Sequence, residues 1–160
     1  VKPFWVCLVP EKRAELTTEG GLDVAGQVIS LKEYVHKLQA SNIKVSLFID
    51  PDDKQIAAAI ECGADAIELH TGAYAEAGLA NDTDVQLAEL KRLEQAVATA
   101  QSLDDKLLIN AGHGLTCDNV NAIAKIDGIY ELNIGHALIA DAVFVGLESA
   151  VTMMKEAMHE

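Results

Sequence analysis

Two histidines in the second half of the chain follow apolar runs and lie beside glycines. His113 has a glycine on each side in LLINAGHGLT (107–116), and His136 directly follows a glycine in YELNIGHALI (130–139). An imidazole titrates near neutral pH, so it can give or take a proton during a reaction. The position of His113 at the end of an apolar run predicts a group that transfers protons.

The glycines beside these histidines predict a phosphate site. Gly114 and Gly135 would let backbone N–H groups approach an anion with no Cβ in the way. The HALIADA sequence after Gly135 has no helix breaker, so the first N–H groups of a helix there could point at a phosphate. His136 could donate to the same group. The alternative is that both glycines only turn the chain.

A glutamate lies inside a third apolar run, DAIELHT (65–71). If this run is a strand, alternation places Glu68 and His70 on one face and their neighbours on the other. Because burying a charge among helices is costly, we expect both to point toward a substrate. Glu68 could stabilise a developing iminium ion or act as a base. The alternative is a structural Glu–His pair.

The segment PEKRAELTTEGGLDVAGQ (10–27) is long for a connection between a strand and a helix. Thr17 and Thr18 offer hydroxyl donors, and Gly20 and Gly21 offer flexible joints. A lid that closes over substrate is one interpretation. An ordinary surface loop is the other.

The elements that must position these residues alternate along the chain. Nearly continuous apolar runs predict strands buried on both faces at 4–10, 44–50, 65–71, 106–112 and 130–136. Helical patterns between and after them fall at 31–40, 52–63, 82–103, 117–126 and 141–158. Asp118 or Asn119 is expected to cap the fourth helix.

This order, without hairpin signals, predicts an α/β fold with a parallel sheet and crossover helices. An open doubly wound sheet and a TIM (β/α)₈ barrel both place ligands at the carboxyl ends of the strands. The sequence has neither a GxGxxG after the first strand nor a GxxxxGK[ST] motif. Every predicted strand ends in polar or ionisable residues, which favours the barrel.

A barrel needs eight strands and typically about 250 residues. The 160 residues supply about five βα units and do not begin with Met. We therefore expect residues 1–160 to form a single partial TIM-barrel domain with strands four to eight, without about three N-terminal βα units.

Charge and cysteine content limit the possible partners. The net charge is −13, and Arg13 and Arg92 are the only arginines. Nucleic acid and anionic membranes are therefore poor partners, and a phosphate would be held mainly by backbone N–H groups. Three widely spaced cysteines argue against a disulfide framework or a structural zinc site and favour the cytoplasm. The sequence has neither a signal peptide nor an apolar stretch long enough to span a membrane.

Five segments together resemble the pyridoxine 5′-phosphate synthase family of vitamin B6 biosynthesis. They are LVPEKRAELTTEGGLDV, VSLFID, IELHTGAYA, INAGHGLT and ELNIGHALI. The resemblance covers essentially the whole chain. It implies a cytoplasmic (β/α)₈ transferase, usually octameric, that uses no metal or organic cofactor. Such an enzyme condenses 3-amino-2-oxopropyl phosphate with 1-deoxy-D-xylulose 5-phosphate to pyridoxine 5′-phosphate, inorganic phosphate and water.

The resemblance also implies residue roles. His113 would be a proton donor and Glu68 a transition-state stabiliser. Thr17, Gly114, Gly135 and His136 match positions that bind the amino-ketone phosphate, and TTEGG resembles a mobile lid. The family's Asn-x-Asp-His motif, its His-x-Arg segment and a catalytic glutamate are not in this sequence, which keeps one of three principal acid–base residues. We therefore expect this polypeptide alone to be inactive.

Two other functions remain open. One is another phosphate-handling barrel, such as a phosphosugar isomerase or a thiamine phosphate synthase-like enzyme, which would need a different set of rim residues. The other is a catalytically dead module that only binds phosphate or assembles.

Overall fold

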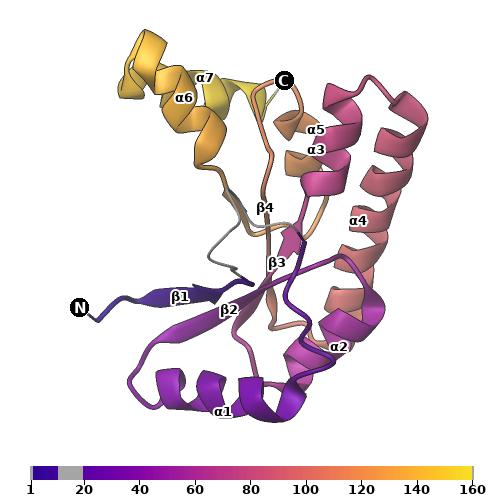
Figure 1. Cartoon of the computed structure of the whole chain (residues 1–160), viewed down its shortest axis with the longest axis vertical. Helices are drawn as coiled ribbons and strands as arrows, with labels where there is room; N and C mark the ends of the chain where they lie inside the picture. The colour runs from indigo at the N-terminus through magenta and orange to yellow at the C-terminus, as the bar shows by residue number, and fades with distance from the viewer. Residues whose placement is uncertain (1, 11–19, 160) are drawn as a thin grey trace.

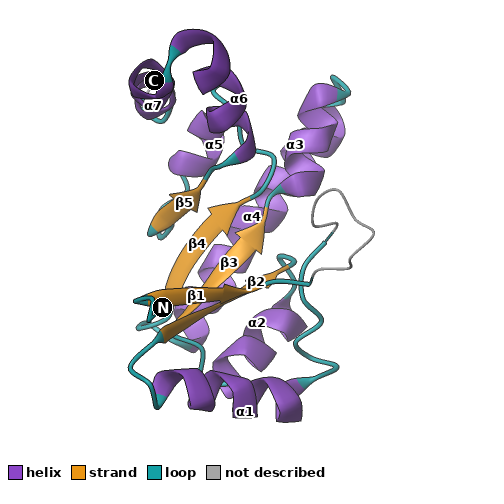
Figure 2. Ribbon diagram, turned by 60° about the vertical axis from the view of Figure 1, so that its left-hand side comes forward, coloured by secondary structure: helices purple, strands orange, loops and turns teal. Residues whose placement is uncertain are grey.

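The computed structural model describes residues 2–10 and 20–159 and contains one five-stranded sheet. The strands are β1 (Trp5–Leu8), β2 (Lys44–Ile49), β3 (Ala66–His70), β4 (Leu108–Gly112) and β5 (Glu131–Asn133). Each strand pairs in parallel with the next in the order β1-β2-β3-β4-β5 (Figure 1 labels β1 to β4, and Figure 2 labels all five). The predicted parallel α/β sheet is confirmed. A doubly wound sheet reverses its strand order, whereas this order runs in one direction, as in part of a (β/α)₈ barrel.

Seven helices occur in the described part of the chain. They are α1 (Val28–Gln39), α2 (Asp53–Glu61), α3 (Gly72–Leu79), α4 (Thr83–Leu103), α5 (Val120–Ala124), α6 (His136–Val145) and α7 (Leu147–Ala157). Helices α1, α2 and α4 cover one face of the sheet, and α6 and α7 lie beyond the carboxyl ends of the strands (Figure 2). No described helix is long and apolar enough to cross a membrane.

One helix prediction was wrong, and one helix was missed. The single helix expected at 141–158 is two helices, because α6 begins five residues earlier and the chain turns at Gly146, where φ is +86°. Glycine adopts this left-handed conformation without the Cβ penalty of other residues. Helix α3 was not predicted, because its apolar residues surround it rather than forming a stripe.

The two faces of the sheet differ in chemistry. On the helix-covered face, Leu47, Ile67 and Ile109 are fully or almost fully buried and form the core with α1, α2 and α4. The alternate residues of the same strands include Glu68 and Asn110, which are neighbours in the register of β3 and β4. The predicted alternation in β3 is therefore confirmed, and the polar residues lie on the inner face.

The segment before α1 runs along the end of β2. The N–H of Leu22 donates to the carbonyl of Phe48 at 2.8 Å, and the N–H of Gly21 donates to Oδ1 of Asp50 at 3.0 Å. Further on, the N–H groups of Val24 and Ala25 both donate to Oε1 of Gln55. These contacts fix the last part of the predicted 10–27 loop. Thr17 and Thr18, predicted to belong to a lid, lie outside the described residues.

Candidate active site

One open cavity lies at the carboxyl ends of the strands. Its volume is about 450 Å³, and its lining includes Glu68, His113, Gly114, Gly135 and His136. These are five of the six residues predicted for the site, and they come from β3, the loop after β4, and the start of α6. The sixth, Thr17, lies outside the described residues. The fold therefore brings together residues that are up to 68 positions apart.

Glu68 points from the middle of β3 into the inner face. Its Oε2 accepts a hydrogen bond from Nδ2 of Asn133 at 2.8 Å and one from Sγ of Cys7 at 3.6 Å. His70 is bonded elsewhere, with Nδ1 at 3.1 Å from Oδ1 of Asp50. The alternative of a structural Glu–His pair is therefore wrong for these two residues. Glu68 is held from two other strands and faces the cavity.

The environment of Glu68 favours its neutral form. Burial raises the pKa of its carboxyl, and the charge of Glu131 acts in the same direction. The hydrogen bonds from Cys7 and Asn133 oppose this, because they stabilise the carboxylate. Since burial dominates, the ionised carboxylate is poorly solvated. A cation that formed beside it would be strongly stabilised.

His113 follows β4 with an unusual backbone. Its φ is +85°, a region that few non-glycine residues adopt. Its ring packs against that of His70 at a centroid distance of 4.8 Å and against Phe48 at 6.3 Å. Burial lowers the pKa of His113, and His70 and His136 lower it further, whereas Glu76 raises it. The imidazolium form of His113 is thus a stronger acid than usual.

The loop after His113 is closed by Asn119. Its Oδ1 accepts from the N–H of Thr116 at 2.8 Å, and its Nδ2 donates to the carbonyl of Gly114 at 3.2 Å. Asn119 occupies the N-cap position of α5, as one predicted alternative had it, but its side chain does not cap the helix. The hydroxyl of Tyr74 donates to the carbonyl of Asn119 at 2.9 Å. These contacts shape the edge of the cavity near Gly114.

Helix α6 begins at the opposite edge of the cavity. Gly135 is its N-cap residue, and no side chain caps the N–H groups of the first turn. A Cβ added at Gly135 would meet nothing within 4 Å, so the approach to these groups is open. His136 is exposed and lines the same cavity. Uncapped N–H groups at a helix start favour an anion.

Sequence reasoning did not find every residue that shapes this site. Phe48 and Val9 also line the cavity as apolar neighbours. Both belong to apolar runs, and an apolar run does not show which of its residues line a cavity. Asn133 has no role in the sequence-based prediction, yet it bonds directly to Glu68. No sequence signal gives this pairing, because it depends on the register of β3, β4 and β5. Within residues 2–10 and 20–159, no group of three His, Cys, Asp or Glu residues could hold a metal ion.

Comparisons with known proteins agree with the resemblance. A family model described as pyridoxal phosphate biosynthesis protein PdxJ matches residues 1–160. A pyridoxine 5′-phosphate synthase of Synechococcus sp. (strain JA-2-3B'a(2-13)) is 56% identical over 158 residues, which are 99% of this chain and 64% of that protein. One of Aliivibrio fischeri (strain ATCC 700601 / ES114) is 55% identical over 157 residues, which are 98% of this chain and 63% of that protein.

The chain thus spans just under two thirds of the length of these curated relatives. A solved structure described as a 4-hydroxy-2-oxoglutarate aldolase/2-deydro-3-deoxyphosphogluconate aldolase from TTHB1 has a TM-score of 0.34 and 13% identity, covering 96% of this chain and 93% of that one. That likeness is too weak to bear on function. The family match over residues 1–160 and the two close relatives do bear on it, and the chain belongs to the family of pyridoxal phosphate biosynthesis protein PdxJ.

Proposed function

We propose that this chain forms one side of a pyridoxine 5′-phosphate synthase site. The reaction would condense 3-amino-2-oxopropyl phosphate with 1-deoxy-D-xylulose 5-phosphate and release inorganic phosphate and water. One observation carries the proposal: Glu68, His113, Gly114, Gly135 and His136 line a single cavity. Two close relatives bear the name of this enzyme.

Acid–base and electrostatic roles divide between two side chains. His113 would donate a proton to a leaving oxygen, since its lowered pKa makes its imidazolium form a readier acid. Glu68 would stabilise positive charge on an iminium formed between the two substrates. Its partly desolvated carboxylate, oriented by Asn133, suits that role, because the interaction strengthens as the cation develops.

The phosphate of the amino ketone would bind between the edges of the cavity. The uncapped first turn of α6, the His136 side chain and the backbone at Gly114 would surround it. This arrangement needs no arginine. Thr17 stays a predicted ligand of the same substrate, and the lid role of the TTEGG segment likewise stays a prediction.

The five strands would correspond to strands four to eight of a (β/α)₈ barrel. Their unreversed order and the 63–64% coverage of the relatives support this assignment. The remaining acid–base groups would lie on strands one to three. A polypeptide of these 160 residues alone would then bind phosphate without turnover. The alternative, a phosphate-binding or assembly module in its own right, is favoured only if a longer protein is also inactive.

Helix α6 supports association with further protein. Its Ile139, Val143 and Phe144 side chains are exposed at 58%, 77% and 88%, and none of its residues is buried. Apolar surface of this kind marks an interface. An octamer in the cytoplasm, as the resemblance implies, would provide one. Size-exclusion chromatography with light scattering tests that assembly.

A steady-state assay tests the reaction. Both substrates are mixed with a protein of the relatives' full length that contains this chain, and pyridoxine 5′-phosphate is quantified. We expect turnover that His113→Gln and Glu68→Gln reduce strongly. A mass-verified 160-residue polypeptide should give none, and turnover by it would refute the incomplete-site proposal. Calorimetry with inorganic phosphate then identifies a phosphate-binding module, which should bind phosphate without turnover. A different barrel enzyme should react with neither of the two substrates.

A further inference from the structure

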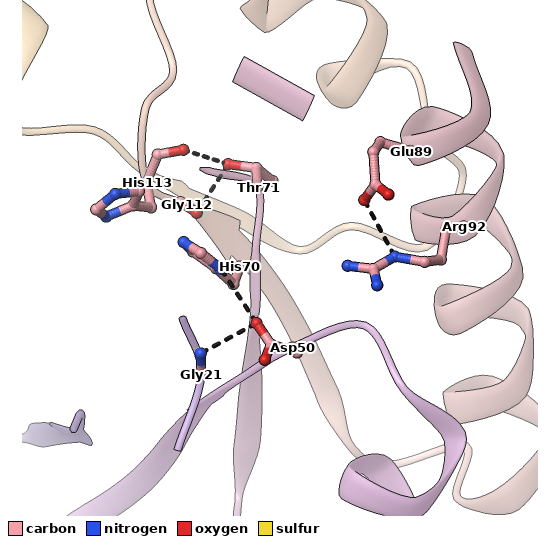
Figure 3. A network of polar contacts seen from close by, with 8 residues as sticks. All are labelled: Gly21, Asp50, His70, Thr71, Glu89, Arg92, Gly112 and His113. Atoms are coloured by element: carbon pink, nitrogen blue, oxygen red, sulfur yellow. Dashed lines mark hydrogen bonds and ion pairs between the residues drawn. The ribbon is translucent and has the colours of Figure 1, made fainter. Parts of the chain in front are cut away.

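His70, the last residue of β3, and Thr71, which follows it, contact His113 through its ring and its backbone respectively (Figure 3). We propose that Thr71 and His70 are positioning residues for His113. Thr71 fixes the backbone, and His70, oriented by Asp50, fixes the imidazole. This inference rests on the proposed role of His113 as proton donor.

The backbone of His113 needs external support. A positive φ is unfavourable in a residue with a Cβ and persists only where neighbouring contacts enforce it. The Oγ1 of fully buried Thr71 lies 2.8 Å from the carbonyl oxygen of Gly112 and 2.6 Å from that of His113. The N–H of Thr71 also donates to Gly112 at 2.9 Å. One threonine thus holds both carbonyls that flank the φ angle of His113.

The ring of His113 packs edge-on against His70. The two rings are 4.8 Å apart at an angle of 62°, and Phe48 lies 5.1 Å from His70 on another side. The Nδ1 of His70 is 3.1 Å from Oδ1 of Asp50, which as a carboxylate can only accept. Nδ1 therefore carries the proton, and the buried Nε2 is left without a hydrogen-bond partner among the described residues. His70 is thereby held in one orientation.

Asp50 is itself fixed from a second element. The same Oδ1 that contacts His70 accepts the N–H of Gly21 at 3.0 Å (Figure 3). The chain from Gly21 through Asp50 and His70 to His113 therefore joins the segment before α1 to the proposed proton donor. The Asp50 side chain is 47% exposed, so it can be changed with little effect on the core.

Gly72 lets the two rings meet. A Cβ there would lie 2.5 Å from Nε2 of His70 and 3.2 Å from Cδ2 of His113. A larger residue would push the rings apart. In the sequence His70-Thr71-Gly72, the first residue contacts the His113 ring and the second bonds to its backbone. The third leaves the space that both contacts require.

The electrostatic effect of His70 on His113 agrees with the contact between their rings. After burial, its charge is the largest influence that lowers the pKa of His113, and His136 lowers it too, while Glu76 raises it. Glu68 faces the same cavity. Replacing His70 with a side chain that cannot carry a charge removes this influence, so the pKa of His113 should rise.

The test measures kcat and KM of variants in a protein of the relatives' full length. Thr71→Val keeps the shape and loses the hydroxyl, and we expect kcat to fall about 10- to 100-fold with KM little changed, as for a misplaced catalytic group. Thr71→Ser should restore most of the rate. Glu89→Gln, which removes a carboxylate from the surface ion pair with Arg92, is the matched control.

A second readout does not depend on activity. His70→Asn keeps an N–H for Asp50 but removes the ring, and the NMR titration of His113 should then shift to higher pH. In the pH profile of kcat, the decrease above the pKa of His113 should shift in the same direction, because His113 must be protonated to donate. Asp50→Asn should reduce kcat less than His70→Asn and decides the question if Thr71→Val does not fold.

The two proposals fail in different ways. If His113→Gln retains wild-type kcat, the proton-donor role is wrong, whatever Thr71 does. The other outcome is that His113→Gln abolishes turnover while the three positioning variants behave as wild type. If Thr71→Val, His70→Asn and Asp50→Asn keep wild-type kcat and an unchanged His113 titration, the positioning role is wrong. The proposed function then stands.

Discussion

Asn133 at the end of β5 donates a 2.8 Å hydrogen bond to Glu68 in the middle of β3, although β4 lies between the two strands. The bond passes Gly112, which is opposite Asn133 in the register. A Cβ at Gly112 would lie 2.5 Å from Oε1 of Glu68 and 2.8 Å from the carbonyl oxygen of Asn133. The missing side chain of Gly112 is therefore what lets the two residues meet.

We predict that Gly112→Ala destabilises the protein by roughly 1–3 kcal/mol and, in a protein of the relatives' full length, lowers the rate of the proposed reaction. The new methyl group meets backbone as well as the Glu68 carboxylate, so rotation of one side chain cannot relieve the clash. Chemical denaturation and steady-state kinetics measure the two effects. Wild-type stability and rate in the Gly112→Ala variant would contradict the role given to Gly112.

Gly135→Ala is the matched opposite case. A Cβ there meets nothing within 4 Å, and φ is −122°, so stability should change by less than about 0.5 kcal/mol. If the first turn of α6 binds phosphate, the methyl group should crowd the anion and raise the Kd for inorganic phosphate in calorimetry. Unchanged phosphate affinity would remove Gly135 from the proposed site.

In a protein of the relatives' full length, Glu68→Gln should lower kcat of the proposed reaction about 10²- to 10³-fold and yet raise the melting temperature at neutral pH. Burial raises the pKa of Glu68 in the folded state above its ordinary value of 4.5. Its contribution to stability is therefore complete below pH 4.5 and is lost as pH rises through the folded pKa. Above the ordinary pKa, burial of this carboxyl opposes folding because it penalises the charged form, and glutamine removes that effect.

Thermal unfolding at pH 4 and pH 7.5 tests this pH dependence. The rise in melting temperature caused by Glu68→Gln should appear at pH 7.5 and vanish near pH 4. Glu33→Gln is the control, because a hydrogen bond from Lys37 lowers the pKa of Glu33, so its contribution has the opposite pH dependence. A lower melting temperature for Glu68→Gln at pH 7.5 would contradict the expectation.

Cys7 should react slowly with alkylating reagents. Cys7 as a whole residue is exposed, but desolvation of its thiol on the inner face and the charge of Glu68 raise the pKa of Cys7 to about 12, so almost no thiolate forms near neutral pH. At pH 7.5 we expect iodoacetamide to modify Cys7 about 10- to 100-fold more slowly than N-acetylcysteine in the same tube. Glu68→Gln should speed the reaction. Peptide mass spectrometry resolves Cys7, and a rate equal to that of the free thiol would disprove this.

The positions of the strands could be predicted because their residues are locally distinctive. VSLFID and DAIELHT are short, apolar and rich in β-branched or bulky residues, and β2 and β3 lie within or next to them. The break at Gly146 could not be predicted, because one glycine in a helical pattern is often tolerated. Whether it turns the chain depends on the packing of α6 against α7.

The sequence predicts that His113 and His136 follow strand ends, but it does not predict their partners. Parallel strands bring their carboxyl ends to one edge, which is why His113 and His136 line one cavity, and alternation turns Glu68, in the middle of β3, toward the same cavity. The contacts of Glu68 with Cys7 and Asn133, and that of His70 with Asp50, depend on inter-strand register and side-chain direction, which no local pattern contains. The left-handed backbone of His113 is also a tertiary effect, because the hydroxyl of Thr71 comes from the end of another strand.

The alternation along β3 has a consequence for how this protein can change over generations. Ile67 and Leu69 face the core, whereas Glu68 and His70 face the other side of the same strand. A substitution at an odd position is selected through folding, and one at an even position through chemistry. Neighbouring codons are therefore under separate constraints, so the inner face can drift toward a new substrate while the scaffold that holds it is inherited unchanged.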